Sequence, residues 1–199
     1  MSITQLPVWD ATAIEIALDL VAPQYAQRPG LNFTGPGEPR VCLVAGFALS
    51  SQLQRIVTAV DRTIPAKLPS PLRISPAPGR SSGSPSGASI QPLLPMLRLQ
   101  SRLIRSVEPG LTNDNLQISL GANRDMDEAT LRFVRDFIAS KALPSFEPLN
   151  GISGAETLRL RVAGVTIYQL GRRGAPQSIV EHWTYKSNGG GSVHLLRGP

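Results

Sequence analysis

The fold is decided by the stretch RVCLVAGFALSSQLQRIVTAV (residues 40–60), which joins a short apolar run to an amphipathic segment. The apolar run RVCLVAGF (40–47) is typical of a buried strand. Apolar residues then recur at helical spacing and predict a helix with one core-facing stripe. The stripe consists of Leu53, Ile56, Val57, Val60 and Ile64. We expect Ser50 or Ser51 to cap this helix and Pro65 to end it.

The same order recurs in QISLGANRDMDEATLRFVRDF (residues 117–137). A short strand is again followed, at nearly the same offset, by a segment with helical apolar periodicity. Asp125 or Asp127 is expected to cap this second helix, which should end near Pro144. The repetition predicts that the chain contains a duplicated strand and helix unit.

The remaining segments predict a mixed α/β pattern without the regular strand–helix alternation of a doubly wound sheet. The segment AIEIALDL (13–20) alternates between apolar and other residues, which is typical of a half-buried strand. An edge strand broken by proline is expected at 68–75, and another strand at 89–96. A closing hairpin is expected from the strands 157–170 and 177–185.

A further helix is expected at LRLQSRLIRSVEPG (97–110). Its predicted core-facing residues are Leu103, Ile104 and Val107. An exposed basic stripe is predicted from Arg98, Arg102 and Arg105. Such a stripe is more often a solvated face than a binding site.

Length and composition fit one globular domain. We expect residues 1-186 to form a single domain of two interleaved lobes, with 76-89 as a flexible hairpin insertion and 187-199 as a flexible tail. No apolar run approaches the roughly 18–20 residues needed to cross a bilayer, and the N-terminus lacks a secretory pattern. We therefore expect a cytoplasmic monomer that does not bind membranes.

The single cysteine, Cys42, excludes an internal disulfide and a cysteine-based zinc site, and we expect neither a metal nor a cofactor. The formal net charge is +6, and all but three of the 20 basic residues are Arg. Arg matches phosphate oxygens with two parallel hydrogen bonds, which favours a phosphate-bearing partner such as RNA. A GC-rich genome would produce the same composition, so both interpretations stay open. Aromatic residues make up only 5% of the chain, which argues against a broad base-stacking surface.

On these features the chain resembles the 2H phosphoesterase superfamily, which includes 2'-5' RNA ligase-like proteins and cyclic phosphodiesterases. Each lobe in that family supplies a strand triplet His-x-Thr/Ser. The matching triplets here are Arg40-Val41-Cys42 and Gln117-Ile118-Ser119. The resemblance covers most of residues 13–185. It implies an α+β fold of two ferredoxin-like lobes, related by a pseudo-two-fold duplication around a central cleft.

The resemblance also implies a site, but one without the family's pair of histidines. In the family one His is the general base and the other the general acid. Arg keeps its proton and Gln does not titrate, so neither Arg40 nor Gln117 can transfer a proton. We therefore expect binding of RNA ends or a small nucleotide phosphate in the cleft, without the family reaction. The expected ligand-binding residues are Arg40, Cys42, Gln117 and Ser119.

Two alternatives stay open, and with them whether the protein is an enzyme. One is a divergent cyclic phosphodiesterase that acts on 2',3'-cyclic or 2'-5' phosphodiester bonds with other groups. The other is a protein–protein interaction scaffold. The two histidines of the chain, His182 and His194, receive no role. Alternation places His182 on the strand face opposite Glu181 and Trp183, where a lone His is usually structural or exposed, and His194 falls in the glycine-rich tail.

Overall fold

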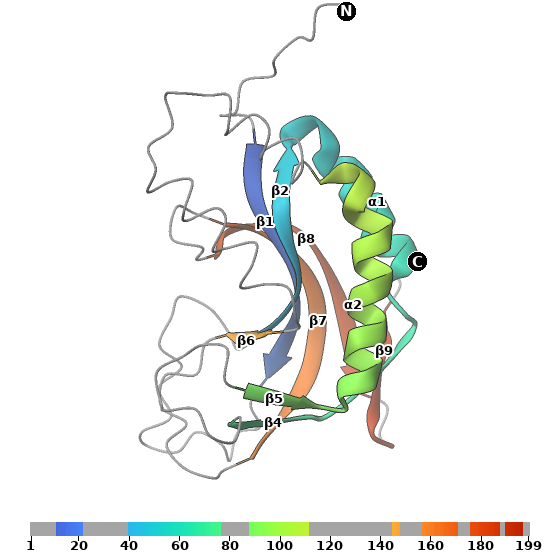
Figure 1. Cartoon of the computed structure of the whole chain (residues 1–199). Helices are drawn as coiled ribbons and strands as arrows, with labels where there is room; N and C mark the ends of the chain where they lie inside the picture. The colour runs from blue at the N-terminus through green and yellow to red at the C-terminus, as the bar shows by residue number, and fades with distance from the viewer. Residues whose placement is uncertain are drawn as a thin grey trace, which may run out of the picture.

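The described part of the chain forms one antiparallel sheet with two α-helices packed against one of its faces. The computed structural model describes residues 11–21, 40–76, 88–111, 145–147, 157–170, 176–187 and 190–196. Within these ranges the sheet has nine strands, and the two helices lie side by side on one face (Figure 1). The predicted α+β class is therefore confirmed. None of the described helices is long and apolar enough to cross a membrane.

The sheet follows a strand order that mixes the two ends of the sequence. The strands are β1 (Ala11–Val21), β2 (Arg40–Leu49), β3 (Lys67–Pro69), β4 (Leu72–Pro76), β5 (Ala88–Gln91), β6 (Ser145–Glu147), β7 (Leu158–Leu170), β8 (Pro176–Ser187) and β9 (Ser192–Leu195). Their order is β3-β9-β8-β7-β1-β2-β6, and β4 pairs with both β5 and β7. The long strands β1 and β7 thus form the centre, and β2 and β8 flank them.

The first helix, α1 (Leu53–Thr63), has the predicted stripe but not the predicted cap. Ile56, Val60 and Ile64 are buried in the core, and the chain leaves the helix just before Pro65. A short 3₁₀ turn (Ser50–Gln52) precedes α1, and no side chain caps either element. The predicted serine cap is therefore wrong, because both serines belong to the 3₁₀ turn that connects β2 to the helix.

The second helix, α2 (Leu93–Val107), begins earlier than predicted. The predicted strand 89–96 is confined to β5, which ends at Gln91, and Leu93 already belongs to the helix. Leu103 and Val107 are buried as predicted, but Ile104 is 40% exposed. Arg98, Arg102 and Arg105 are all exposed, as the basic stripe predicts.

The core lies between the helices and the face of the sheet that they cover. β1 contributes Ile14, Ile16, Leu18 and Leu20, all at most 1% exposed. Each of these apolar residues is separated from the next by one position, so they share one face of the strand as predicted. The same core holds buried residues of β2, β7 and both helices. Full burial of such side chains is worth about 1.5–3 kcal/mol each and is the main force that holds helices to sheet.

One polar side chain on the helix side has a structural role. The pairing of β1 with β2 shifts register between Ile16 and Ala17, so Leu43 is an extra residue, a β-bulge, on β2. The buried Gln100 of α2 donates a hydrogen bond from Nε2 to the Leu43 carbonyl at 2.9 Å. It thereby supplies the partner that the bulge removes from the ladder.

Three further predictions concern the periphery of the sheet. β4 and β5 pair as a hairpin across residues 77–87, which lie outside the described residues, and β7 and β8 form the predicted closing hairpin. The prediction of a structureless tail is wrong for β9, which lies between β3 and β8 and buries Val193. The whole of the predicted second unit, residues 117–137, lies outside the described residues, so the duplicated lobes stay a prediction.

Candidate active site

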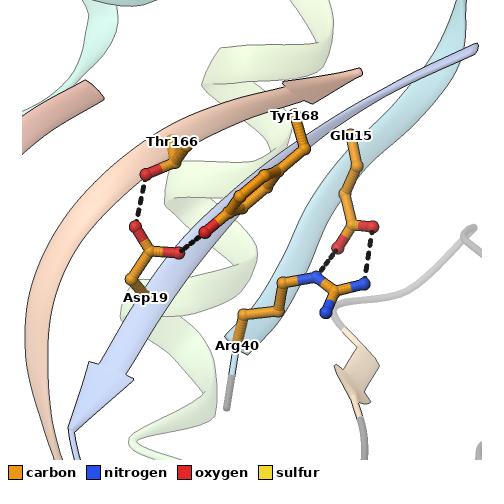
Figure 2. A network of polar contacts seen from close by, with 5 residues as sticks. All are labelled: Glu15, Asp19, Arg40, Thr166 and Tyr168. Atoms are coloured by element: carbon orange, nitrogen blue, oxygen red, sulfur yellow. Dashed lines mark hydrogen bonds and ion pairs between the residues drawn. The ribbon is translucent and has the colours of Figure 1, made fainter. Parts of the chain in front are cut away.

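The face of the sheet turned away from the helices carries charged and polar side chains. Since the even-numbered residues of β1 enter the core, Glu15 and Asp19 point to this other face. Arg40 of β2 and Thr166 and Tyr168 of β7 lie beside them (Figure 2). Four of the set are at most 6% exposed by residue: Glu15, Asp19, Arg40 and Thr166. We call this set, with His182 of β8, the polar face.

Arg40 and Glu15 form a buried ion pair at one end of the polar face. Arg40 Nε donates to Glu15 Oε1 at 3.1 Å, and Arg40 Nη2 donates to Glu15 Oε2 at 3.3 Å. The Arg40 guanidinium also lies 5.7 Å from the centre of the Tyr168 ring. Two parallel hydrogen bonds and an aromatic neighbour are the arrangement in which a buried guanidinium is best compensated. Any anion that binds Arg40 through this edge must therefore compete with Glu15.

Asp19 is the centre of a second network. Tyr168 donates its hydroxyl proton to Asp19 Oδ1 at 2.6 Å, and Thr166 donates to Asp19 Oδ2. Thr166 Oγ1 also lies 2.6 Å from Nδ1 of His182, and that nitrogen is 3.5 Å from Asp19 Oδ2. The carboxylate on β1 therefore organises two hydroxyls from β7 and an imidazole from β8.

The hydroxyl of Tyr168 is held in its protonated form. Burial raises the pKa of Tyr168 well above its usual value, and the neighbouring Asp19 carboxylate raises the pKa further. Tyr168 is therefore a fixed hydrogen-bond donor to Asp19 and a poor proton-transfer group.

The hydrogen bonds assign the tautomer of His182. A threonine hydroxyl has one proton, and Thr166 donates it to the carboxylate, which can only accept. The short contact between Thr166 and His182 then requires Nδ1 of the imidazole to donate. In the neutral ring the lone pair consequently lies on Nε2.

A glycine makes room for this imidazole. His182 is on β8 opposite Thr166, and its ring leans over Gly164 of β7. A Cβ atom at residue 164 would lie 2.4 Å from His182 Cε1 and 2.8 Å from the Trp183 carbonyl oxygen. Only glycine therefore allows the ring to lie against the strand beside Asp19. The His182 side chain is 41% exposed, so the ring is accessible from solvent.

This arrangement has the parts of a proton-transfer site. An imidazole changes its charge near neutral pH, and a carboxylate that orients one ring nitrogen leaves the other to act as a base. The orienting group here is Asp19, acting directly and through Thr166. Among the described residues, no group of three or more His, Cys, Asp or Glu side chains is arranged to hold a metal ion.

The structure brings together only part of the predicted site. Arg40 is on the polar face, and Cys42 is fully buried two positions along β2, opposite Ala17. Gln117 and Ser119 lie outside the described residues. The four residues are therefore not shown to converge.

Asp19 was not predicted as a site residue, and no role was predicted for His182. His182 does lie on the face opposite Trp183, whose indole Nε1 donates to Asp61 of α1 at 2.9 Å on the helix side. It is not isolated, however, because strand pairing brings Asp19 to it from the other end of the chain. The available signal was the pair of carboxylates, Glu15 and Asp19, in the middle of an apolar strand. His194 lies in β9, next to Lys67 and Lys186 and not in a free tail.

Comparisons with protein families and with curated proteins found no match for this sequence. Among solved structures, the chain is similar to the crystal structure of E. coli LigT in its apo form. The two chains are 13% identical at a TM-score of 0.42, and the match covers 88% of this chain and 98% of that chain. No residue role is carried over from this likeness.

Proposed function

We propose that the polar face is an acid–base site in a protein of the 2H phosphoesterase-like kind. His182 transfers a proton during cleavage of a phosphodiester of RNA or of a small nucleotide. This is the divergent phosphodiesterase that the sequence left open, because the transferring group is not one of the two motif positions. The observation that carries the proposal is the contact of His182 Nδ1 with Thr166 and Asp19.

The physical support comes from the cost of the arrangement. Burying a carboxylate is expensive, and a fold gains little from it unless the charge is used or paired. Asp19 is 6% exposed, and all its described partners are the hydroxyls of Thr166 and Tyr168 and the imidazole of His182. Buried titratable groups gather at functional sites, and here the buried Asp19 carboxylate lies beside the accessible imidazole.

The substrate class rests on the sequence. The triplets that begin at Arg40 and Gln117 resemble those of phosphodiester-cleaving proteins, and the formal net charge of +6 favours a phosphate-bearing partner. In this proposal the unit at 117–137 forms the second lobe, and Gln117 and Ser119 face the polar face across a cleft. The buried charges of the polar face argue against the scaffold alternative, for which we expect an apolar or neutral surface.

A pair of histidine variants tests the acid–base role. The substrates are 2',3'-cyclic nucleotides and 2'-5'-linked oligonucleotides, and release of product is followed by chromatography. We expect turnover by the wild type and a loss of about 10²–10⁴-fold in kcat for His182→Asn, because general acid–base catalysis is worth that much. Asparagine retains a polar group near Thr166, so the fold should survive.

The matched control is His194→Asn, which removes the chain's other imidazole from β9. We expect its turnover and its melting temperature to equal those of the wild type. Absence of turnover by the wild type across the whole panel contradicts the proposal, as does equal activity of His182→Asn and the wild type.

A second candidate function is phosphate binding without turnover. It is favoured by the presence of a single imidazole in the described network, whereas the family reaction uses two proton-transfer groups. Tyr168 cannot be the second, because its pKa is raised and its proton is committed to Asp19.

Calorimetric titration with nucleoside 2'- and 3'-monophosphates tests this second function. The double variant Glu15→Leu/Arg40→Met removes the guanidinium together with the Glu15 carboxylate, so neither member of this buried ion pair is left without the other. We expect this variant to lose binding if Arg40 contacts the phosphate. If the double variant binds these monophosphates as tightly as the wild type, Arg40 does not contact the phosphate.

A further inference from the structure

Three exposed arginines lie at one end of the polar face. They are Arg73 of β4 and Arg159 and Arg161 of β7. In β4 and β7 the neighbouring residues Leu72, Ile74, Leu158, Leu160 and Val162 are buried in the core. The arginines therefore point to the opposite face of the sheet, away from the helices. We call them the arginine row.

Strand register places the arginine row in line with His182. Asp19 pairs with Gly164, over which the His182 ring lies, and Val21 pairs with Arg161. Arg161 is thus two residues of β1 beyond Asp19, or about 7 Å along the strand. Arg159 follows after two more residues, or about 13 Å from the level of Asp19. The row extends from the site in one direction along the same face.

The row is electrostatically unfavourable in the free protein. Arg73 and Arg159 are directly opposite each other in the antiparallel pair of β4 and β7. Like charges at directly opposite positions repel and destabilise a sheet. Within the part of the chain that the structure describes, none of the three pairs with a carboxylate. A bound polyanion would relieve this repulsion, which an uncharged ligand would not.

We propose that the arginine row binds the phosphates of a nucleic-acid strand whose scissile bond lies at His182. This deepens the proposed function and rests on it for the position of the scissile bond. The substrate is then an oligonucleotide rather than a single nucleotide. In a stacked strand successive nucleotides rise about 3.4 Å, so the distance of about 13 Å from the level of Asp19 to Arg159 corresponds to about four of them. The contacts are to the backbone, because guanidinium groups match phosphate oxygens and the row contains no aromatic side chain for base stacking.

Fluorescence anisotropy with labelled oligonucleotides of one to about eight residues tests the row. We expect affinity to rise with length up to about four or five nucleotides and then to level off. The variant Arg73→Gln/Arg159→Gln/Arg161→Gln should bind at least about tenfold more weakly. For this variant the slope of log K against log salt concentration should be smaller in magnitude by about 2, because each lost phosphate contact to a single strand removes about 0.7 from the slope. Oligoribonucleotides and oligodeoxyribonucleotides of equal length tell which strand is preferred, and binding of either supports the row.

The matched control is Arg98→Gln/Arg102→Gln/Arg105→Gln on α2. It removes the same charge from exposed positions on the opposite face of the sheet. We expect its affinity and salt dependence to stay close to those of the wild type. Equal losses in the two triple variants mean that binding follows net charge alone, and they overturn the proposal. Equal affinity of the wild type for poly-glutamate of matched charge also overturns it.

The two proposals fail separately. The arginine row predicts that His182→Asn binds long oligonucleotides as tightly as the wild type, even when it cleaves nothing. It also predicts that the row variant turns over small cyclic nucleotides with an unchanged KM but raises KM for an oligonucleotide at least about tenfold. If the wild type, His182→Asn and the row variant all bind oligonucleotides with an affinity that does not depend on length, the proposed role of the arginine row is wrong. That result would not affect the proposed role of His182.

Discussion

The two faces of the sheet differ in the side chains that the central strand β1 presents on them. On the face that the helices cover, β1 presents only Ile14, Ile16, Leu18 and Leu20. On the other face the same strand presents Glu15 and Asp19, buried against Arg40, Thr166 and Tyr168 (Figure 2). The covered face supplies the free energy of folding. The polar face carries a desolvation cost that its ion pair offsets at best, which agrees with the acid–base role that we propose for it.

The largest expected change in the free energy of unfolding comes from breaking the buried ion pair on the polar face. Glu15→Leu removes the carboxylate that pairs with the buried Arg40 guanidinium, which should lower the free energy of unfolding by about 3–5 kcal/mol. The double variant Glu15→Leu/Arg40→Met should be within about 1 kcal/mol of the wild type or more stable, because an apolar pair has no desolvation cost. Urea unfolding followed by circular dichroism measures both. A double variant as unstable as the single one shows that the ion pair itself stabilises the fold, and the contrast between the faces is lost.

A smaller change in stability is expected from loss of the hydrogen bond between Gln100 of α2 and Leu43 of β2. Gln100→Leu keeps the volume but leaves the Leu43 carbonyl at the bulge without its donor. The free energy of unfolding should fall by about 1–3 kcal/mol. Ile104→Ala, on the exposed side of α2, is the control and should change stability by less than about 0.5 kcal/mol. An unchanged free energy of unfolding in Gln100→Leu would mean that the Leu43 carbonyl at the bulge does not need this hydrogen bond.

The smallest effect is confined to alkaline solution. The pKa of Tyr168 is raised in the folded protein above its usual value of 10.0. Folding then favours the protonated phenol. Its contribution to stability is complete below pH 10.0 and is lost as the pH rises toward the folded-state pKa. Thermal melting across this range should show the wild type losing stability more steeply than Tyr168→Phe. Parallel curves would show that Tyr168 ionises as readily in the folded as in the unfolded chain.

The covered face was predictable from the sequence and the polar face was not. The alternation in 13–20 and the helical stripe after Leu53 are local patterns, and both are confirmed. The start of α2 was missed because two prolines flank its first residues, and Pro92 caps the helix where a strand was expected. The network of Asp19 and His182 was missed because it depends on strand pairing between distant segments, which periodicity does not reveal. Arg40 was predicted as a ligand-binding residue, but its ion pair with Glu15 was not predicted.

The bulges decide which side chains the polar face receives. In β7 the residues that enter the hydrophobic core are 158, 160 and 162, but after the register shift opposite Asp19 and Leu20 they are 165 and 167. One extra residue thus changes the parity of the strand, so that Thr166 and Tyr168 emerge beside Asp19 while Val165 and Ile167 enter the core. A lineage could alter these side chains one at a time by substitution. Deletion of a single residue at the bulge, however, would exchange the two faces for the rest of the strand, so the length of β7 is constrained more tightly than its composition.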